Sequence, residues 1–458
     1  MRTQFSPTQL RDAEMAQSEK ILRACVHCGF CNATCPTYLQ TGDENDGPRG
    51  RIYMMREMLQ SKAAPDARTV AHIDSCLSCL GCATTCPSGV DYMRLADHAR
   101  AHIETHYRRP VFERMFRATL GFVLPHPARF AFAVRLGRLA APFSRLLPKR
   151  LARMIAMASF GSQERLMSLR GAQRRGNPES HAKALPFDSG SPRFARDDKE
   201  VALAQGETKK VRVALLNGCV QPTLAPEINA ATIRLLTRLG VEVVAPENAG
   251  CCGALSHHLG QTDTSKDFAR ANIRAWMECA NSGGLDAILI TASGCGTQVK
   301  DYGHMLRDDT TYAEDAAHIS AITQDISEFL SDLDLPEPAH RQDVRVAYHA
   351  ACSLQHGQKL SGKAESLLHK AGFDVLIPRD AHLCCGAAGS YTLLQPEMSE
   401  RLAQNKAENL LALQPDFIAT GNIGCQVQIA GVTQTPTLHW VQLLDMALRQ
   451  HLSCVFPR

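Results

Sequence analysis

Apolar positions in the first hundred residues recur every three or four places, which is typical of short helices joined by loops. Residues 7–23 predict one helix and residues 52–59 a second, because their apolar side chains keep helical spacing. Glycine and proline interrupt the pattern between 38 and 51 and indicate a loop. A longer helical pattern follows over 92–110. We therefore expect an α-helical first domain over residues 1–110.

The pattern changes over residues 111–160, where apolar and arginine side chains alternate along the expected helices and acidic residues are almost absent. Such helices bind an anionic membrane surface or an acidic partner subunit, or they pack on the protein's own core with their arginines in water. The next stretch, 161–208, combines glycine, proline and polar residues without sustained periodicity. We interpret it as a linker.

The second half of the chain contains an internal repeat of buried strands and amphipathic helices. This alternation predicts two pseudo-duplicated α/β domains with parallel sheets, over residues 209–335 and 336–458. The whole chain is then a multidomain α+β protein. The expected strands are 211–216, 241–244 and 286–290 in the first copy and 344–349, 373–377 and 416–420 in the second, with helices at 227–239 and 363–371.

Composition and charge are those of an ordinary globular protein. Of its 458 residues, 45% are hydrophobic and 21% are charged. The net charge of +4 is small for this length and argues against a nucleic-acid partner. The N-terminus lacks the apolar core of a signal peptide, and no apolar run approaches the roughly 18 residues of a membrane span. We expect a cytoplasmic protein, at most peripheral on the cytoplasmic face of the inner membrane.

The 18 cysteines are too dilute for a secreted disulfide scaffold, and their clustering indicates metal binding in a reducing compartment. Two runs share one pattern, in which three cysteines are spaced by two residues and a fourth is followed by proline. This pattern is typical of proteins with two [4Fe–4S] clusters, where the fourth cysteine of each run ligates the other cluster. The expected ligands are Cys25, Cys28, Cys31 and Cys86 for one cluster, and Cys76, Cys79, Cys82 and Cys35 for the other.

A second group of cysteines recurs in the internal repeat. The same interval separates Cys219 from Cys251 and Cys352 from Cys384, and each copy contains an adjacent pair followed by a glycine that leaves room for a bulky group. These cysteines follow the expected strands, at the sheet edge where ligand sites gather. We expect them to converge between the two copies as a further iron–sulfur or metal site; buried free thiols are the alternative. The set is Cys219, Cys251, Cys252, Cys295, Cys352, Cys384, Cys385 and Cys425.

Basic residues near the cysteines are open to two interpretations. Arg49 and Arg51 either offset the negative charge of a thiolate-ligated cluster or belong to a solvated basic loop. His257, His258 and His349 either hydrogen-bond to a centre or are ordinary buried histidines, and the second case is the commoner one. The chain has no strand–GxGxxG–helix fingerprint, GxxxxGK[ST] loop or GxSxG elbow, so we assign no nucleotide site and no catalytic residue.

The chain resembles the iron–sulfur subunits of bacterial glycolate oxidase, also called glycolate dehydrogenase, over nearly its full length. The resemblance includes connecting sequences as well as the cysteines themselves. It rests on Arg23-Ala-Cys25-Val-His-Cys28-Gly-Phe-Cys31, Asp46-Gly-Pro-Arg-Gly-Arg-Ile-Tyr53, Gly218-Cys219-Val-Gln-Pro-Thr-Leu224, Gly250-Cys251-Cys252-Gly253 and Leu383-Cys384-Cys385-Gly386.

The resemblance implies that the repeat is a pair of CCG domains, as in heterodisulfide reductase and in subunits for lactate utilisation. It also implies an oxidoreductase complex in which FAD-containing partner subunits oxidise glycolate to glyoxylate with a non-NAD acceptor. This chain is then expected to pass electrons toward a quinone, at the inner-membrane surface. One departure is that the wider Cys-x-x-Cys pattern reads Cys295-Gly-Thr-Gln298 and Cys425-Gln-Val-Gln428 here, so a non-cubane cluster is not assumed.

Other functions stay open at this point. The same arrangement of electron-transfer centres suits an L-lactate or glycerol-3-phosphate dehydrogenase, because no residue of this chain is expected to touch the oxidised substrate. The cysteine pairs at 251/252 and 384/385 also suit a disulfide reductase, in which they react themselves. A ferredoxin-like adaptor that only docks flavoproteins is a further alternative.

Overall fold

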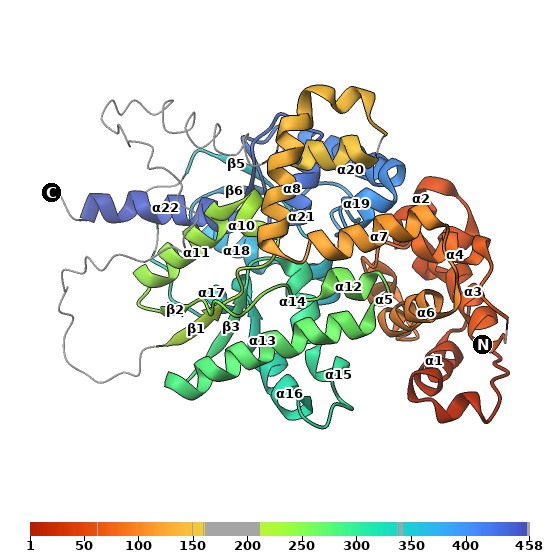
Figure 1. The fold of residues 1–458 in the computed structure, drawn as a ribbon. Coiled ribbons are helices and arrows are strands. Elements are labelled where there is room, and N and C mark those ends of the chain that lie inside the picture. The colour runs from red at the N-terminus through yellow and green to blue at the C-terminus, as the bar shows by residue number, and fades with distance from the viewer. Residues whose placement is uncertain are drawn as a thin grey trace.

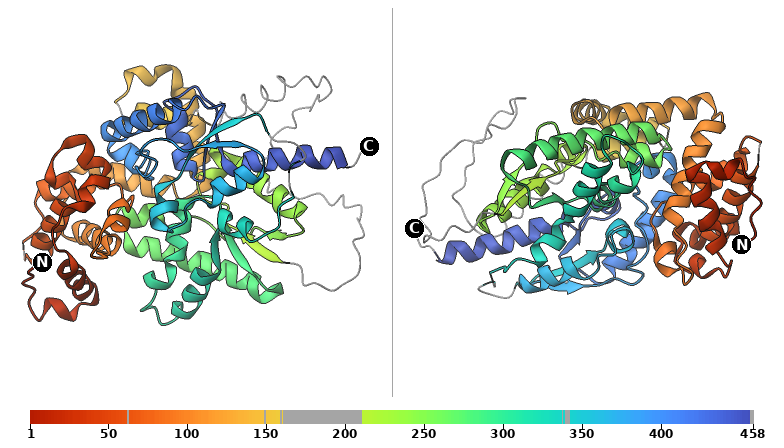
Figure 2. Two further views of the ribbon diagram at one scale, coloured as in Figure 1. Left: turned by 180° about the vertical axis from the view of Figure 1, so that it is seen from behind. Right: turned by 90° about the horizontal axis from the view of Figure 1, so that it is seen from below.

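The computed structural model of the chain describes residues 1–61, 63–148, 150–158, 160, 211–336, 338 and 342–455. A helical N-terminal region forms one end of the molecule, and two sheet-containing repeats form the rest (Figure 1). Views from behind and from below show the same division (Figure 2). The predicted fold class is confirmed, since a helical region precedes two α/β repeats with parallel sheets. The predicted linker, 161–208, lies outside the described residues.

Four helices enclose the core of the N-terminal region. They are α1 (Ala13–Ala24), α3 (Pro48–Gln60), α4 (Ala67–Asp74) and α6 (Tyr92–His106), with η1 (Gln9–Arg11), η2 (Phe30–Thr34), α2 (Pro36–Thr41), η3 (Glu44–Asp46) and α5 (Gly81–Thr85) between them. Asp12 begins α1 by accepting a hydrogen bond from the backbone N–H of Met15 at 2.9 Å. The apolar sides of these helices meet in one core, which includes Leu22, Met55, Leu59, Ile73, Leu95 and Ile103.

Helices α7 (Val111–Val123) and α8 (Pro127–Ala140), followed by η4 (Ala141–Leu146), leave the N-terminal region and cross the two repeats (orange in Figure 1). Leu120 packs against Leu259 of the first repeat and Leu393 of the second, as the core-packing interpretation expected. None of the described helices is both long and apolar enough to cross a bilayer. The other side of this segment exposes large apolar side chains, namely Phe112, Met115, Phe122, Phe132, Leu136, Leu139 and Phe143.

Each repeat is built on a four-stranded parallel sheet, with strand order β2-β1-β3-β4 in the first and β6-β5-β7-β8 in the second. Val213 pairs with Val243 and Ala287 in the first sheet, and Val346 occupies the equivalent register in the second. Edge strands β4 and β8 were not predicted, because their residues, Thr-Gln-Asp and Thr-Leu-His, form no apolar run. The strands are β1 (Arg212–Leu215), β2 (Glu242–Val244), β3 (Ala287–Ile290), β4 (Thr323–Asp325), β5 (Arg345–His349), β6 (Asp374–Leu376), β7 (Phe417–Thr420) and β8 (Thr437–His439).

Helices cover both sheets. In the first repeat they are α10 (Gln221–Leu224), α11 (Pro226–Arg238), α12 (Ala254–His258), α13 (Thr262–Gly283), α14 (Ser293–Lys300), α15 (Tyr302–Met305), α16 (Ala313–Ile322) and α17 (Ile326–Ser331). In the second repeat they are η5 (Ser353–Gly357), α18 (Lys363–Lys370), α19 (Tyr391–Leu394), α20 (Pro396–Leu411), α21 (Ile423–Ala430) and α22 (Trp440–Val455).

The two repeats meet at the carboxyl ends of their strands. His439 Nε2 lies 2.8 Å from the carbonyl oxygen of Thr291, and the hydroxyl oxygens of Ser293 and Ser353 are 2.7 Å apart. All four residues lie at or just beyond the carboxyl end of a strand. The edges that carry the cysteines of the two repeats therefore face one another.

Candidate iron–sulfur centres

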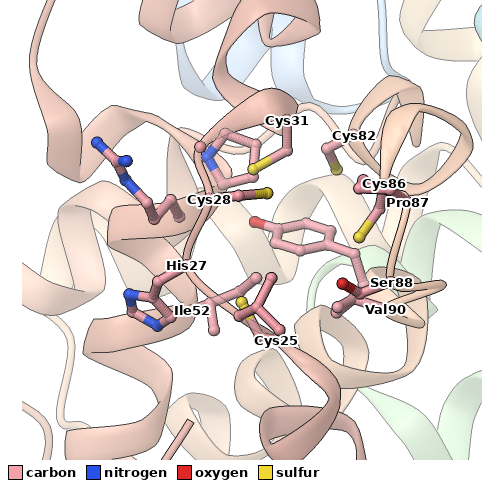
Figure 3. A pocket seen from close by; sticks show the side chains of 15 residues that line it. Cys25, His27, Cys28, Cys31, Ile52, Cys82, Cys86, Pro87, Ser88 and Val90 are labelled. Atoms are coloured by element: carbon pink, nitrogen blue, oxygen red, sulfur yellow. The ribbon is translucent and has the colours of Figure 1, made fainter.

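The first cysteine run and the end of the second run line one pocket (Figure 3). The backbone at His27 and Gly29 has positive φ values of 58° and 86°, which turn the chain around the pocket after α1. Cys28 is exposed, so this pocket opens toward the surface. The predicted ligands of the first cluster are therefore brought together, with Cys82 beside them. The cysteines of the pocket are Cys25, Cys28, Cys31, Cys82 and Cys86.

A second pocket adjoins the first, since Cys82 lines both. Ser78 and Leu80, on either side of Cys79, have positive φ values of 51° and 61°, which side chains other than glycine rarely adopt. This unusual turn reverses the chain within the cysteine run. The four predicted ligands of the second cluster line this pocket; they are Cys35, Cys76, Cys79 and Cys82.

A buried arginine forms part of the wall of the second pocket. Arg51 is 1% exposed. Its guanidinium donates to Thr37 Oγ1 at 3.0 Å and to Ser75 Oγ at 2.7 Å. The same group lies 3.8 Å from Cys35 Sγ and 3.7 Å from Asp46 Oδ1. The guanidinium is thus held rigidly against a predicted cluster ligand.

The structure separates the roles of Arg49 and Arg51. Arg49 lines the first pocket and forms a partly exposed ion pair with Glu44, with 2.6 Å between Nε and Oε1. Arg51 is instead buried beside the sulfur atoms of the second pocket. Burial by itself would raise the pKa of the Cys76 thiol, but Arg51 and Arg100, together with hydrogen bonds from the Ser78 N–H and the Tyr92 hydroxyl, hold that pKa below its ordinary value. The buried positive charge therefore favours the thiolate, which is the form that binds metal.

Both pockets have the donor set that a [4Fe–4S] cluster needs. Five thiols line the first pocket and four line the second, where the buried Arg51 opposes the negative charge that a thiolate-ligated cluster carries. Tyr92 lines both pockets, and its hydroxyl donates to Cys76 Sγ at 3.6 Å. Hydrogen bonds to sulfur and burial are the features by which proteins set cluster potentials.

The cysteines of the second repeat gather beyond β5, β6 and β7. The sulfur atoms of Cys352 and Cys384 are 3.6 Å apart. Cys385 interacts with both Cys384 and Cys425. The interaction with Cys384 lowers the pKa of the Cys385 thiol, but the interaction with Cys425 and burial together raise it. One further residue joins this group, since the ligand atoms of His349, Cys385 and Cys425 lie within 4.8 Å of one another. The sequence offered one signal for His349, a polar residue at the end of an apolar strand.

The cysteines of the first repeat form a matching group. Cys251 interacts with Cys219 and Cys252, and Cys252 interacts with Cys295. The N–H of Gly253 donates to Cys251 Sγ at 3.5 Å. The four cysteines of this repeat therefore lie together, as do those of the second repeat.

The glycines after the cysteine pairs serve the packing of a helix. Gly253 and Gly386 have φ values of +84° and +86°. A Cβ at Gly253 would lie 2.9 Å from the carbonyl oxygen of Ser265 in α13, and one at Gly386 would lie 2.7 Å from that of Ser399 in α20. We expected these glycines to make room for a bulky group; the neighbour is instead the backbone of the following helix.

The second pocket is in contact with the second repeat. Leu77 packs with Cys384 and Tyr391, and both Cys79 and Cys352 lie against this cluster. The first pocket therefore adjoins the second pocket, and the second pocket in turn contacts the cysteines of the second repeat.

Comparisons with known proteins agree with this architecture. Residues 21–90 match the 4Fe-4S dicluster domain, and residues 213–300 and 346–430 each match the cysteine-rich domain. The chain is 40% identical over 450 residues to the glycolate oxidase iron-sulfur subunit of Escherichia coli (strain K12), covering 98% of this chain and 100% of that one. It is 32% identical over 425 residues to the probable glycolate oxidase iron-sulfur subunit of Bacillus subtilis (strain 168), covering 88% and 87%.

A solved structure of a hypothetical protein from Helicobacter pylori is similar in fold, with a TM-score of 0.52 and 10% identity. The match covers 96% of this chain and 74% of that one. Fold and site together define a two-cluster iron–sulfur protein with a pair of cysteine-rich domains. The chain belongs to the family of glycolate oxidase iron-sulfur subunits. Its dicluster domain indicates two [4Fe–4S] clusters, and the cysteine-rich domains suggest further iron–sulfur centres.

Proposed function

We propose that this chain is the electron-transfer subunit of a glycolate oxidase (glycolate dehydrogenase) complex. FAD-containing partner subunits oxidise glycolate to glyoxylate, and this chain passes the electrons toward a quinone-type acceptor. The main support is the series of adjoining cysteine sets, which runs from an exposed pocket at Cys28 to the buried cysteines of the second repeat. The names of the two relatives support the substrate.

The chain's own residues hold and insulate the centres. Cys25, Cys28, Cys31 and Cys86 would ligate one cluster, and Cys76, Cys79, Cys82 and Cys35 the other. When bound, the clusters supply one-electron chemistry that no side chain of this chain supplies. Arg51 balances the negative charge of the second cluster, and the surrounding apolar core excludes water.

The exposed pocket also carries an apolar surface suited to a partner. Val26 is 66% exposed and Phe30 is 64% exposed, and both belong to the first cysteine run. Tyr53, 49% exposed, lies beside His27. Exposed apolar side chains grouped around a functional site are typical of protein interfaces. We place the docking of the FAD-containing subunits here.

The function is tested by purifying the complex through a tag on this chain. FAD-containing subunits should co-purify, and glycolate should reduce ubiquinone-1 faster than D-lactate, L-lactate or glycerol 3-phosphate does. Faster reduction with lactate or glycerol 3-phosphate would assign the complex to that substrate instead. Turnover of disulfides by this chain alone would contradict a pure relay.

We further propose that the exposed side of α7 and α8 lies on an anionic membrane surface. Phe112 is 88% exposed, and the exposed charges beside the apolar row are Arg114, Arg129 and Arg135. Glu113, the one acidic residue in the sequence of these helices, is paired with two arginines. A bilayer surface matches both features, because acyl chains receive the rings and lipid phosphates receive the guanidinium groups.

Replacing Phe112 and Leu139 together with serine should weaken binding of the full chain to vesicles of phosphatidylglycerol and phosphatidylethanolamine about tenfold or more. Each buried apolar side chain contributes roughly 2 kcal/mol to such binding. Co-sedimentation measures the bound fraction, and Ile377→Ser, at a site 54% exposed on the second repeat, is the matched control. Unchanged vesicle binding with loss of the co-purifying subunits would make this side a protein interface instead.

A further inference from the structure

The second cysteine-rich repeat contains a buried histidine with two unpaired ring nitrogens. His349 is the last residue of β5 and is 1% exposed. Neither Nδ1 nor Nε2 has a hydrogen-bond partner among the residues that the structure describes. Leaving one buried polar group unpaired costs about 1–3 kcal/mol. An unpaired buried polar group in a native structure therefore calls for an explanation, and a bound ion is one of those known.

The surroundings of His349 point to metal. Its ligand atom and those of Cys385 and Cys425 lie within 4.8 Å of one another. Metal–nitrogen and metal–sulfur bonds are about 2.0–2.3 Å long, so small side-chain rotations bring these three ligand atoms within bonding distance of one metal ion.

Another potential donor near this group is already occupied. Gln428 stands where the wider Cys-x-x-Cys pattern has its second cysteine. Its Nε2 donates to the carbonyl oxygen of Ser399 at 2.9 Å, and its Oε1 accepts from Arg153 at 3.0 Å and from Thr392 at 3.2 Å. Because both ends of this amide are engaged, Gln428 does not serve as a ligand. The second repeat thus offers four thiols and the imidazole of His349.

The first repeat offers no imidazole at the equivalent place. Residues 211–216 align with residues 344–349, so Leu216 corresponds to His349. Leu216 is 3% exposed and belongs to the apolar cluster that contains Cys252. The two repeats, otherwise alike in strand order and cysteine spacing, differ in this donor.

We propose that His349 is a nitrogen ligand of the iron–sulfur centre in the second cysteine-rich repeat, beside Cys385 and Cys425, and that the first repeat has no counterpart. The inference rests on a metal centre in this repeat, but not on the substrate or acceptor of the complex. A neutral imidazole leaves a centre less negative than a thiolate does and raises its reduction potential. A cysteine at position 349 would therefore give this centre a lower potential than the histidine does.

The test is spectroscopic and uses the full chain. Protein labelled with ¹⁵N-histidine is loaded with iron and sulfide without oxygen, and reduced with dithionite. Pulsed EPR should show a strong histidine-nitrogen coupling that disappears in His349→Leu, which copies the first repeat. His356→Gln is the control, because His356 is bonded to Thr84 and to the carbonyl oxygen of His382 and should not contribute. Absence of the coupling in the wild type, or its survival in His349→Leu, overturns the inference.

A second variant separates ligation from packing. His349→Cys keeps a metal-binding side chain, so it should retain iron, lose the nitrogen coupling and lower the midpoint potential of this centre. His349→Leu should lose about half or more of the iron of this centre, as expected for a missing ligand. Equal iron content and equal potentials in both variants and the wild type would make His349 a packing residue. These measurements need no turnover, so a failure of glycolate oxidation would not affect them.

Discussion

Replacing Cys79 with alanine is expected to abolish glycolate-dependent reduction of ubiquinone-1 by the complex, while glycolate still reduces the flavin of the partner subunits. Cys79 lines the second pocket and lies against the apolar cluster that also contains Cys384. Its loss leaves this pocket with three sulfur donors at the point where it meets the second repeat. Electrons from the flavin then have no complete route through the chain. Anaerobic flavin bleaching and the quinone assay measure the two halves of the reaction separately.

The control for this variant is Cys279→Ala. Cys279 lies on α13, is partly exposed and belongs to neither cysteine group. Its replacement should leave quinone reduction within about twofold of the wild type, because surface substitutions away from special features have small effects. Undiminished quinone reduction in the Cys79 variant would contradict the proposed series of centres.

Replacing Arg51 with methionine should remove the second cluster and destabilise the N-terminal region. The substitution leaves Asp46 and the thiolates of the second pocket without their buried positive charge. Removing one partner of a buried ion pair typically costs about 3–5 kcal/mol. Iron content should fall by about four atoms per chain, the content of one cubane cluster. Iron and acid-labile sulfide analysis, together with thermal unfolding, measure both effects.

Arg49→Met is the matched control, since the two arginines are two positions apart in the same helix. Arg49 pairs with Glu44 at the surface, and exposed ion pairs contribute about 0–1 kcal/mol. Because Arg49 lines the first pocket and not the second, this variant should keep the iron of the second cluster and nearly all its stability. Equal iron loss in the two variants would assign the effect to general charge rather than to the buried contact. Arg51→Lys, which keeps the charge but not the forked geometry, should lie between them.

The sequence by itself determined the parts of this protein that depend on local spacing. Three cysteines separated by two residues each, with a fourth before proline, place their sulfurs around one point through nearby backbone turns, so the pattern is readable without the fold. Apolar strands followed by helices likewise predicted two parallel sheets. The edge strands β4 and β8 were missed because their sequences are mostly polar, and their pairing depends on the strand beside them.

Tertiary structure alone decided how these parts meet, because contacts between distant segments depend on packing that no local spacing encodes. Arg49 and Arg51 carry the same charge two residues apart, and only the fold buries one against Cys35. The second pocket adjoins the second repeat through Leu77 and Tyr391, which are far apart in the chain. His349 looked like an ordinary strand residue until the fold placed it, unpaired, beside two cysteines. The local sequence thus identified the cysteine ligands of the two clusters, whereas the fold determined how the centres contact one another.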